Sequence, residues 1–364
     1  MPVPLFDTSA PLRPLRRELS AKAVEVLERG TYVLGSELEA FEREFAGYLG
    51  AGHAVGVANG TDAITIALRA LGVGSGDEVV VPSFTFYASA EAILPTGANP
   101  VFCDVDAETA CVTAETVAAA LTPRTKAVVV VDLFGNVAPV EEIAALGVPV
   151  VEDAAQAAGS RAAAGRRAGA LGAALATFSF FPSKNLPAFG DGGAVVTDDA
   201  ELAEAVRMLR FHGSRDKLTF DLVGQNSRLD ELQAALLRLE LPHLDAWCEG
   251  RRAAAALYEA TGLGELAGLP RATEGCQPAW HVYVIRHPRA DPLADALRRA
   301  GVGHRAYYRV PTHRQPAMRE YGAGAELRAT EELARTNLAI PMSPVLTERQ
   351  AAEVVAAIRD AGLG

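Results

Sequence analysis

The chain has 364 residues, of which 49% are hydrophobic and 22% charged, so we expect a folded protein of about two domains rather than a disordered chain. The formal net charge of −11 disfavours nucleic acid as a partner, because phosphate backbones are bound by clustered cationic side chains. No apolar run is as long as a membrane span and the N-terminus lacks the apolar core of a secretion signal, so we expect a cytoplasmic protein with no membrane partner.

Helical and strand patterns alternate through the first 150 residues. A helix is predicted over 36–49, with Ser36 as its N-cap and Gly50 as its stop signal. Short valine-rich runs predict buried parallel strands at 78–82, 100–105, 127–133 and 148–153. A further strand is predicted at 53–58, and helices at 61–71, 87–95, 114–121 and 139–145. The alternation predicts a large, doubly wound, mixed or parallel α/β sheet, in which ligands bind outside the carboxyl ends of the strands.

The second half of the chain begins with two more predicted strands and then changes character. The strands are expected at 174–181 and 194–198, followed by helices at 199–210 and 229–260, the second with a possible break at Pro242. Further on, we predict a strand at 280–286, an irregular segment at 307–316, and helices at 291–301 and 347–362. Because the strand–helix rhythm stops near 230–260, we predict a large domain over 1–245, with an N-terminal helical segment, and a small α+β domain over 246–364.

Lysine is rare in this sequence, and one lysine has unusual neighbours. Only four of the 34 basic residues are lysines, and Lys22, Lys126 and Lys217 lie in segments typical of solvated surface charges. Lys184 instead follows two phenylalanines and precedes a glycine-rich turn, in SFFPSKNLPAFGDGG (179–193). Because apolar surroundings lower the pKa of an amine, Lys184 is the candidate for Schiff-base chemistry with an aldehyde cofactor such as pyridoxal 5'-phosphate (PLP).

PLP also needs a carboxylate at its pyridine nitrogen and an aromatic surface against its ring. Asp153 ends the predicted strand 148–153 and is the candidate carboxylate; the alternative is that it only caps the AAQAAG turn that follows. Phe86 follows the strand 78–82 and is the candidate for ring stacking; the alternative is an ordinary core phenylalanine. Both residues lie at predicted carboxyl ends of strands, where this class of sheet binds its ligands.

The phosphate of PLP needs backbone N–H groups at a helix N-terminus, together with hydroxyl groups. Gly60 and Thr61 lie between a predicted strand and a predicted helix, and Ser179 lies five residues before Lys184. These three residues are the candidate phosphate cradle. The alternative for the first two is an ordinary capped turn.

Five segments of the sequence carry these candidates or extend them. They are VANGTDAI (57–64), VPSFTFYAS (81–89), VVEDAAQAAG (150–159), FSFFPSKNLPAFGDGGAVVT (178–197) and GQNSRLDELQAALL (224–237). Together they resemble the DegT/DnrJ/EryC1/StrS family, whose members are PLP-dependent aminotransferases of fold type I that act on nucleotide-linked keto-sugars. The resemblance extends from about residue 12 to about residue 355, nearly the whole chain.

The resemblance implies specific roles at the cofactor. Lys184 would form the Schiff base and then move the proton between substrate and cofactor carbons. Asp153 would pair with the pyridine nitrogen, Gln156 would hydrogen-bond the phenolic oxygen, and Phe86 would stack on the ring. Gly60, Thr61 and Ser179 would hold the phosphate.

The resemblance also implies an oligomer. The family asparagine that matches Asn226 reaches the phosphate in the partner's site, so a homodimer with shared active sites is expected. Tyr308 and His313, in YYRVPTHRQP (307–316), match a segment near the sugar pocket; they and Arg228 are candidate substrate contacts. The seven histidines and four cysteines show no metal-binding spacing, so no metal site is predicted.

The chain departs from the family pattern at a few positions. Family members often have histidine where this chain has Asp132 and Ala158, and glycine where it has Pro187. None of these changes removes a group that Schiff-base chemistry needs. Related dehydratases carry histidine in place of the lysine, so Lys184 indicates amine transfer instead.

The predicted function is therefore a PLP-dependent sugar aminotransferase. It would move the amino group of L-glutamate (or glutamine) to a nucleotide-diphosphate keto-deoxysugar, and the segment 212–231 favours dTDP-3-keto-6-deoxyhexose. Three alternatives remain: a relative that aminates a non-nucleotide cyclic ketone such as an inosose or an aminobenzoate precursor, a 4-keto sugar aminotransferase, and a non-catalytic binding protein of the same fold.

Overall fold

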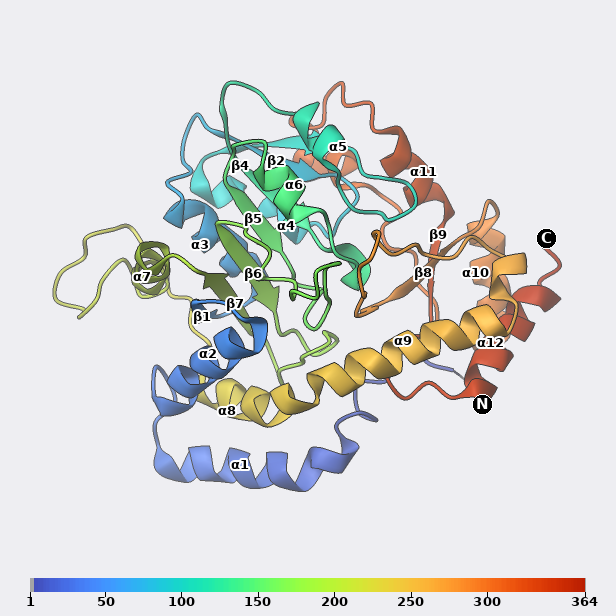
Figure 1. The fold of residues 1–364 in the computed structure, drawn as a ribbon, viewed down its shortest axis with the longest axis horizontal. Coiled ribbons are helices and arrows are strands. Elements are labelled where there is room, and N and C mark those ends of the chain that lie inside the picture. Colours follow the sequence, from blue (N-terminus) through green and yellow to red (C-terminus); the bar gives the residue numbers. More distant parts are fainter. Residues whose placement is uncertain (1–2, 364) are drawn as a thin grey trace.

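The apolar strand patterns of the first 200 residues assemble into one sheet with helices on both sides (Figure 1). The computed structural model describes residues 3–363. The strands are β1 (His53–Val57), β2 (Glu78–Pro82), β3 (Asn99–Cys103), β4 (Thr125–Val131), β5 (Val150–Asp153), β6 (Leu175–Ser179), β7 (Gly193–Thr197), β8 (Tyr283–Arg286) and β9 (Asn337–Ile340). The helices are α1 (Arg16–Arg29), α2 (Ser36–Leu49), α3 (Gly60–Ala70), α4 (Ala88–Glu91), α5 (Ala114–Ala118), α6 (Val140–Ala144), α7 (Ala200–Leu209), α8 (Glu231–Glu240), α9 (Leu244–Ala260), α10 (Ala290–Arg299), α11 (Arg328–Thr336) and α12 (Glu348–Asp360).

The large sheet has seven strands in the order β1-β7-β6-β5-β4-β2-β3. The strands β3, β2, β4, β5 and β6 pair in parallel, whereas β7 is antiparallel to both β6 and β1. The predicted doubly wound α/β fold, with a mostly parallel sheet, is confirmed. Because β1 runs in the same direction as β6, the carboxyl ends of β1, β2, β4, β5 and β6 all lie at one edge of the sheet.

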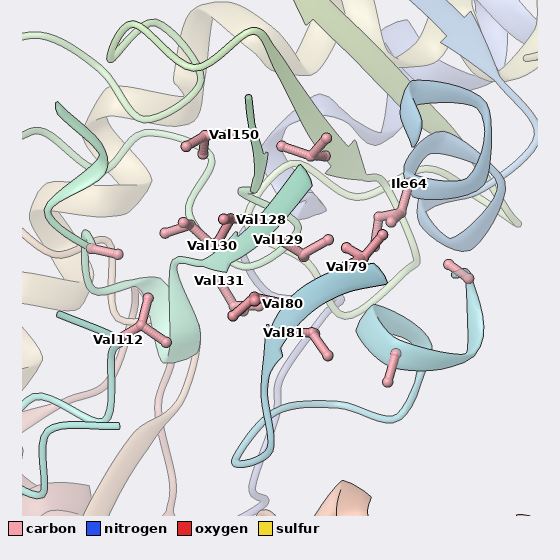
Figure 2. Packing of buried hydrophobic residues seen from close by; sticks show 14 of the residues in the cluster. Ile64, Val79, Val80, Val81, Val112, Val128, Val129, Val130, Val131 and Val150 are labelled. Atoms are coloured by element: carbon pink, nitrogen blue, oxygen red, sulfur yellow. The ribbon is translucent and has the colours of Figure 1, made fainter. Parts of the chain in front are cut away.

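Two hydrophobic clusters pack against the sheet. In the first, the valines of β2 and β4 pack with Ile64 of α3, and Figure 2 shows Val79, Val128 and Val129 within this cluster. These strands are buried on both faces, which explains why their sequences are continuous valine runs rather than alternating patterns.

The second cluster lies between α2 and the face of the sheet at β6, and it is aromatic. Phe41 and Phe45 of α2 meet Phe178 and Phe180 at ring-centroid distances of 5.0 to 5.5 Å, mostly edge to face. Each of these buried rings contributes roughly 1.5–3 kcal/mol to folding. The helices α2 and α8 pack together over this face, and α1 packs on α8 (Figure 1).

The predicted start of the helix 36–49 is correct, but its cap is not Ser36. The N-cap position is Gly35, and the cap comes from Glu231, at the start of α8. Its carboxylate accepts the backbone N–H groups of Gly35 (2.9 Å), Glu37 (3.0 Å) and Leu38 (2.9 Å). A side chain almost 200 residues away thus replaces the local cap, which a sequence pattern cannot reveal. The predicted stop at Gly50 is confirmed, since its φ is 80°.

Other boundaries differ for local reasons. The helix predicted over 87–95 is only α4, followed by a 3₁₀ turn at Leu94–Thr96 that contains Pro95. The possible break at Pro242 is confirmed, because a 3₁₀ turn at Leu241–His243 separates α8 from α9. We did not predict α11 or β9; β9 has four residues, and its strand partner is the distant β8.

The C-terminal third builds its own hydrophobic cluster around β8, β9, α9, α10 and α12. Val3, at the start of the described chain, packs into this cluster and bridges to Val302. The division into 1–245 and 246–364 stays a prediction. Within residues 3–363, no helix is both long enough and apolar enough to cross a membrane.

Candidate functional site

A cleft of about 1000 Å³ opens at the edge where the parallel strands end. Its walls come from the first turn of α3, the loop after β2, the ends of β5 and β6, and the segment 305–310. This is the edge at which sheets of this topology bind ligands. Eight of the predicted site residues line the cleft: Gly60, Thr61, Phe86, Asp153, Gln156, Ser179, Lys184 and Tyr308.

Lys184 lies in a short loop that is fixed at several points. The backbone N–H of Ala188 donates to the carbonyl of Phe180 (2.6 Å), and that of Lys184 donates to Phe181 (2.8 Å). The next side chain, Asn185, is buried and donates from Nδ2 to the carbonyl of Ala279 (3.1 Å). Lys184 itself is therefore presented to the cleft from a defined backbone rather than from a mobile surface loop.

The Lys184 amine is a weak base for a lysine. Removal from water lowers its pKa from 10.5 to about 8, and the nearby Asp153 carboxylate opposes this change only in part. An appreciable fraction of the amine is therefore neutral, and nucleophilic, near neutral pH.

Asp153 ends β5 and is 5% exposed. Oδ2 accepts the hydroxyl of Ser89 (2.8 Å), and Oδ1 accepts the backbone N–H of Ala155 (3.2 Å). Ser89 is in turn 3.0 Å from the hydroxyl of Thr85. Burial raises the pKa of Asp153, while these hydrogen bonds and the charge of Lys184 act in the other direction. The cleft thus contains a buried carboxylate that hydrogen bonds hold in one orientation.

The first turn of α3 forms a narrow cradle against Ser179. A Cβ atom at Gly60 would lie 2.8 Å from the Cβ atom of Ser179, so only glycine fits this approach. Asn59 caps the helix by accepting the N–H of Asp62 (2.8 Å), which leaves the N–H groups of the first turn at Gly60 and Thr61 without intrahelical partners. Free N–H groups at a helix N-terminus, beside the Ser179 hydroxyl, suit an anionic group such as a phosphate.

Gln156 and two aromatic residues form the remaining polar and flat surfaces. Gln156 Oε1 accepts the N–H of Phe134 (2.7 Å), and its Nε2 donates to the Tyr308 hydroxyl (3.3 Å). The first bond fixes the amide so that its N–H groups point to Tyr308 and the cleft. Phe86 is 54% exposed despite its size and lies 6.1 Å from the Tyr308 ring. An exposed aromatic face in a cleft is available to a planar ligand.

Three predicted site residues do not line this cleft. Asn226 is exposed, and Arg228 lies near it, outside the lining residues. His313 is 2% exposed; its Nδ1 lies 2.6 Å from the Ser83 hydroxyl and its Nε2 lies 3.1 Å from Glu331. Both ring nitrogens therefore have protein partners. The roles of these three residues stay predictions.

The cleft also holds residues that the sequence did not single out. Ser89 fixes Asp153, His281 is 5% exposed with Nδ1 unpartnered among the described residues, and Arg305 lies over the Tyr307 ring at 5.2 Å. Burial, with the charges of Lys184 and Arg251, lowers the pKa of His281 well below its usual value. Ser89 belongs to the segment 81–89 that resembles the family, so the sequence could have identified it. His281 lies near the start of a predicted strand, and no sequence pattern marks it as a site residue.

The residues present fit PLP. The cleft has one low-pKa amine for the aldehyde, one buried carboxylate for the pyridine nitrogen, a helix N-terminus with a hydroxyl for the phosphate, and an exposed aromatic ring. The close approach of Gly60 to Ser179 is the strongest of these observations. A side chain at position 60 would collide with Ser179, so the glycine keeps the backbone N–H groups of the first turn open to a ligand.

The comparisons with known proteins agree with this composition. The profile of the DegT/DnrJ/EryC1/StrS aminotransferase family matches residues 14–359. A dTDP-3-amino-3,4,6-trideoxy-alpha-D-glucose transaminase from Streptomyces venezuelae is 46% identical, over 98% of this chain and 96% of the relative. A protein from Geobacillus stearothermophilus named pleiotropic regulatory protein is 43% identical, over 99% of this chain and 98% of the relative.

A solved structure is similar along the same length. The crystal structure of S. venezuelae DesV in complex with a ketimine intermediate superposes with a TM-score of 0.95 and 45% sequence identity, covering 99% of this chain and 98% of that one.

Proposed function

We propose, from the premise that this chain belongs to the DegT/DnrJ/EryC1/StrS aminotransferase family, that it transfers the amino group of L-glutamate (or glutamine) to a nucleotide-diphosphate keto-deoxysugar. We favour a dTDP-3-keto-6-deoxyhexose as the acceptor, since the S. venezuelae relative is named for a dTDP sugar with an amine at carbon 3. The observation that carries the transaminase chemistry is the Lys184 amine, with its pKa of about 8, in the same cleft as the buried Asp153 carboxylate.

Lys184 would hold the aldehyde carbon of PLP and would move the proton during transfer. When bound, PLP supplies a carbonyl that condenses with amines and a ring that accepts electrons. A group that both takes and returns a proton works best when its pKa is close to the working pH, and the Lys184 pKa of about 8 meets that condition. The fixed loop around Asn185 keeps Nζ in position for this transfer.

Asp153 would keep the pyridine nitrogen protonated, since a buried carboxylate stabilises a positive charge beside it. The Ser89 hydroxyl and the Ala155 N–H hold both of its oxygens, so the carboxylate needs little rearrangement when the cofactor binds. The N–H groups at the start of α3, with the hydroxyls of Thr61 and Ser179, would hold the phosphate. Gln156 Nε2 would hydrogen-bond the phenolic oxygen, and Phe86 would cover the ring.

A homodimer with shared sites belongs to this proposal. Asn226 lies at the end of the segment 211–226, which projects beyond α7 (Figure 1). Two side chains of this segment are apolar yet almost fully exposed: Leu218 is 82% and Val223 is 88% exposed. A second copy that covers them would bring Asn226 to the partner's phosphate, as the family resemblance implies. A cytoplasmic location stays a prediction.

The substrate assignment is tested by an acceptor panel. Purified, PLP-loaded protein is incubated with glutamate or glutamine and with a dTDP-3-keto-6-deoxyhexose, its 4-keto isomer, or an inosose, and the amine product is measured by mass spectrometry. We expect the 3-keto sugar to react fastest, with Lys184→Ala as the control that gives no product. Turnover of the inosose alone would favour a non-nucleotide acceptor. Bound PLP without turnover of any acceptor would favour a regulatory role, in line with the name of the G. stearothermophilus relative.

A further inference from the structure

Two buried carboxylic acids lie beside Asp153, and the mechanism above makes no use of them. Asp132 directly follows β4 and Glu152 is the third residue of β5; each is 0% exposed. One oxygen of each accepts a backbone N–H: Asp132 Oδ1 from Ala138 (2.8 Å) and Glu152 Oε1 from Gly169 (2.7 Å). The remaining oxygens, Asp132 Oδ2 and Glu152 Oε2, have no hydrogen-bond donor among the described residues.

The pairing of β4 with β5 brings these acids together. Val130 pairs with Glu152 and Val131 with Asp153, so Asp132 follows directly at the end of the same ladder. The backbone N–H of Asp132 donates to the carbonyl of Asp153 (3.1 Å). Asp132 and Glu152 are therefore neighbours across the two strands, and each has one carboxyl oxygen without a donor among the described residues. Because successive strand residues point to opposite faces, Glu152 meets Asp132 behind the surface that Asp153 presents to the cleft.

Ionisation of both acids at once is unfavourable, because it would place two negative charges side by side in the protein interior. Within residues 3–363, the titratable groups that act on the pair are each other, Asp153 and the thiol of Cys111, and none of these is a cation. Burial raises the pKa of both carboxyl groups. Repulsion from Glu152 adds to this at Asp132, and repulsion from Asp153 adds to it at Glu152, where Asp132 and the Gly169 N–H act in the other direction. Two facing carboxylates would also leave two buried oxygens without donors, whereas a single proton between them satisfies both.

We propose that Asp132 and Glu152 share one proton, held in a hydrogen bond from one of the two unpartnered oxygens to the other, and that this pair positions Asp153. The proton reduces the charge of the three neighbouring acids from −3 to −2, so less repulsion opposes ionisation of Asp153. The same bond ties the end of β4 to β5, and through the Asp132 N–H it fixes the backbone of Asp153. The positioning role rests on the proposed function; the shared proton does not.

The proton itself can be detected by infrared spectroscopy of the apoprotein at pH 7. A protonated buried carboxyl group has a carbonyl band that a carboxylate lacks. We expect such a band in the wild type, its shift on ¹³C labelling of Asp or Glu side chains, and its loss in both Asp132→Asn and Glu152→Gln. Another buried acid, Glu240, has no hydrogen-bond partner for either oxygen in the described part of the chain and a pKa raised to about 9, so it should give its own band. Glu240→Gln is the matched control that removes only that second band.

Unfolding of the apoprotein gives a second readout that does not depend on catalysis. A folded-state pKa raised above the unfolded value means that the folded state binds one proton more, so stability falls as pH rises between the two values. Relative to Asp132→Asn, whose amide donates without titrating, the wild type should lose a factor of about ten in its folding equilibrium constant per pH unit as the pH rises above the usual range of carboxyl groups. Parallel pH profiles for the two proteins, or an unchanged infrared spectrum in Asp132→Asn, would overturn the shared proton.

The positioning role is tested by comparing two replacements of Asp132. Asp132→Asn keeps a donor to Glu152 and the charge of −2, so PLP affinity and the pH profile of kcat/KM should stay within about twofold. Asp132→Val removes the donor and should weaken PLP binding or shift that profile; Glu152→Gln, which preserves the bond, should behave like Asp132→Asn. Equal behaviour of Asn and Val variants would overturn the role. If no acceptor reacts with any variant, the proposed function fails. The infrared and unfolding results would still show whether Asp132 and Glu152 share a proton.

Discussion

The cleft at the strand ends and the projecting segment 211–226 are organised in opposite ways. In the cleft, Asp153 and Gln156 are both buried, and hydrogen bonds to their own chain hold them. In the segment, Leu218 and Val223 are almost fully exposed, and Asn226 is exposed and does not line the cleft of its own chain. The cleft residues are held by contacts within their own chain, whereas the segment presents apolar surface that this chain does not cover. The contrast fits the proposed homodimer, in which the single chain would supply the chemistry and Asn226 from a second copy would add to cofactor affinity.

The largest expected effect comes from the cleft. Lys184→Ala should abolish the glutamate half-reaction, with a loss of about 10⁴-fold or more, because no other group in the cleft can hold the aldehyde and move the proton. The rate of conversion of PLP to its amino form by glutamate, followed by absorbance, measures this directly. Circular dichroism should show an unchanged fold, and near-normal turnover would show that the wrong amine has been assigned.

Asp153→Asn should have the next largest effect. Loss of one preorganised charge at the pyridine nitrogen should slow transfer by about 10² to 10³-fold. The amide keeps the shape of the carboxyl group and can still interact with Ser89, so the protein should fold normally. Steady-state kinetics with glutamate and the preferred sugar measure the loss, and a change smaller than threefold would mean that another group maintains that proton.

The projecting segment should give a smaller effect that a second chain can rescue. Asn226→Ala should weaken PLP binding by about tenfold or more, the value of one hydrogen bond to a charged group. Mixing inactive Lys184→Ala with Asn226→Ala should restore cofactor affinity at one of the two sites of each hybrid dimer, because that site has both residues intact. No recovery in hybrids shown to form would contradict the shared-site arrangement.

The smallest effect is on stability and follows from the pKa of Lys184. Its folded-state pKa is about 8, below the 10.5 of a free lysine, because the amine is buried. At neutral pH the folded apoprotein therefore carries a poorly solvated positive charge. Stability should therefore rise with pH between about 8 and 10.5, where the unfolded chain binds the extra proton. Lys184→Met should stabilise the apoprotein at pH 7 by about 1–3 kcal/mol, measured by denaturant unfolding, and should flatten that alkaline rise. A destabilised Met variant would argue against a poorly solvated amine.

The sequence predicted those parts of the fold that depend on neighbouring residues. The valine runs predicted the strands, and the strand order then brought Asp153, Ser179 and the first turn of α3 to one edge. Lys184 was found because lysines are few and its neighbours are apolar. These signals come from neighbouring residues, and the order of strands and helices then brings the residues together in one cleft.

Features that depend on distant contacts could not be predicted in this way. The Glu231 cap on α2 joins segments almost 200 residues apart, and β9 becomes a strand only because β8 lies beside it. His281 lines the cleft from the segment just before β8, and Asp132 lies beside Glu152 only through the register of β4 with β5. In each case the contact partner is distant in the sequence, so the residues next to each position do not indicate which partner it will meet.

The most direct test of the central claim is to identify which lysine holds the cofactor. The PLP-loaded protein is reduced with borohydride and digested, and the modified peptide is identified by mass spectrometry; the chain offers only Lys22, Lys126, Lys184 and Lys217. We predict that the modification lies on the peptide that contains Lys184, with none on the other three. Modification of another lysine, or no stable attachment at all, would contradict the account.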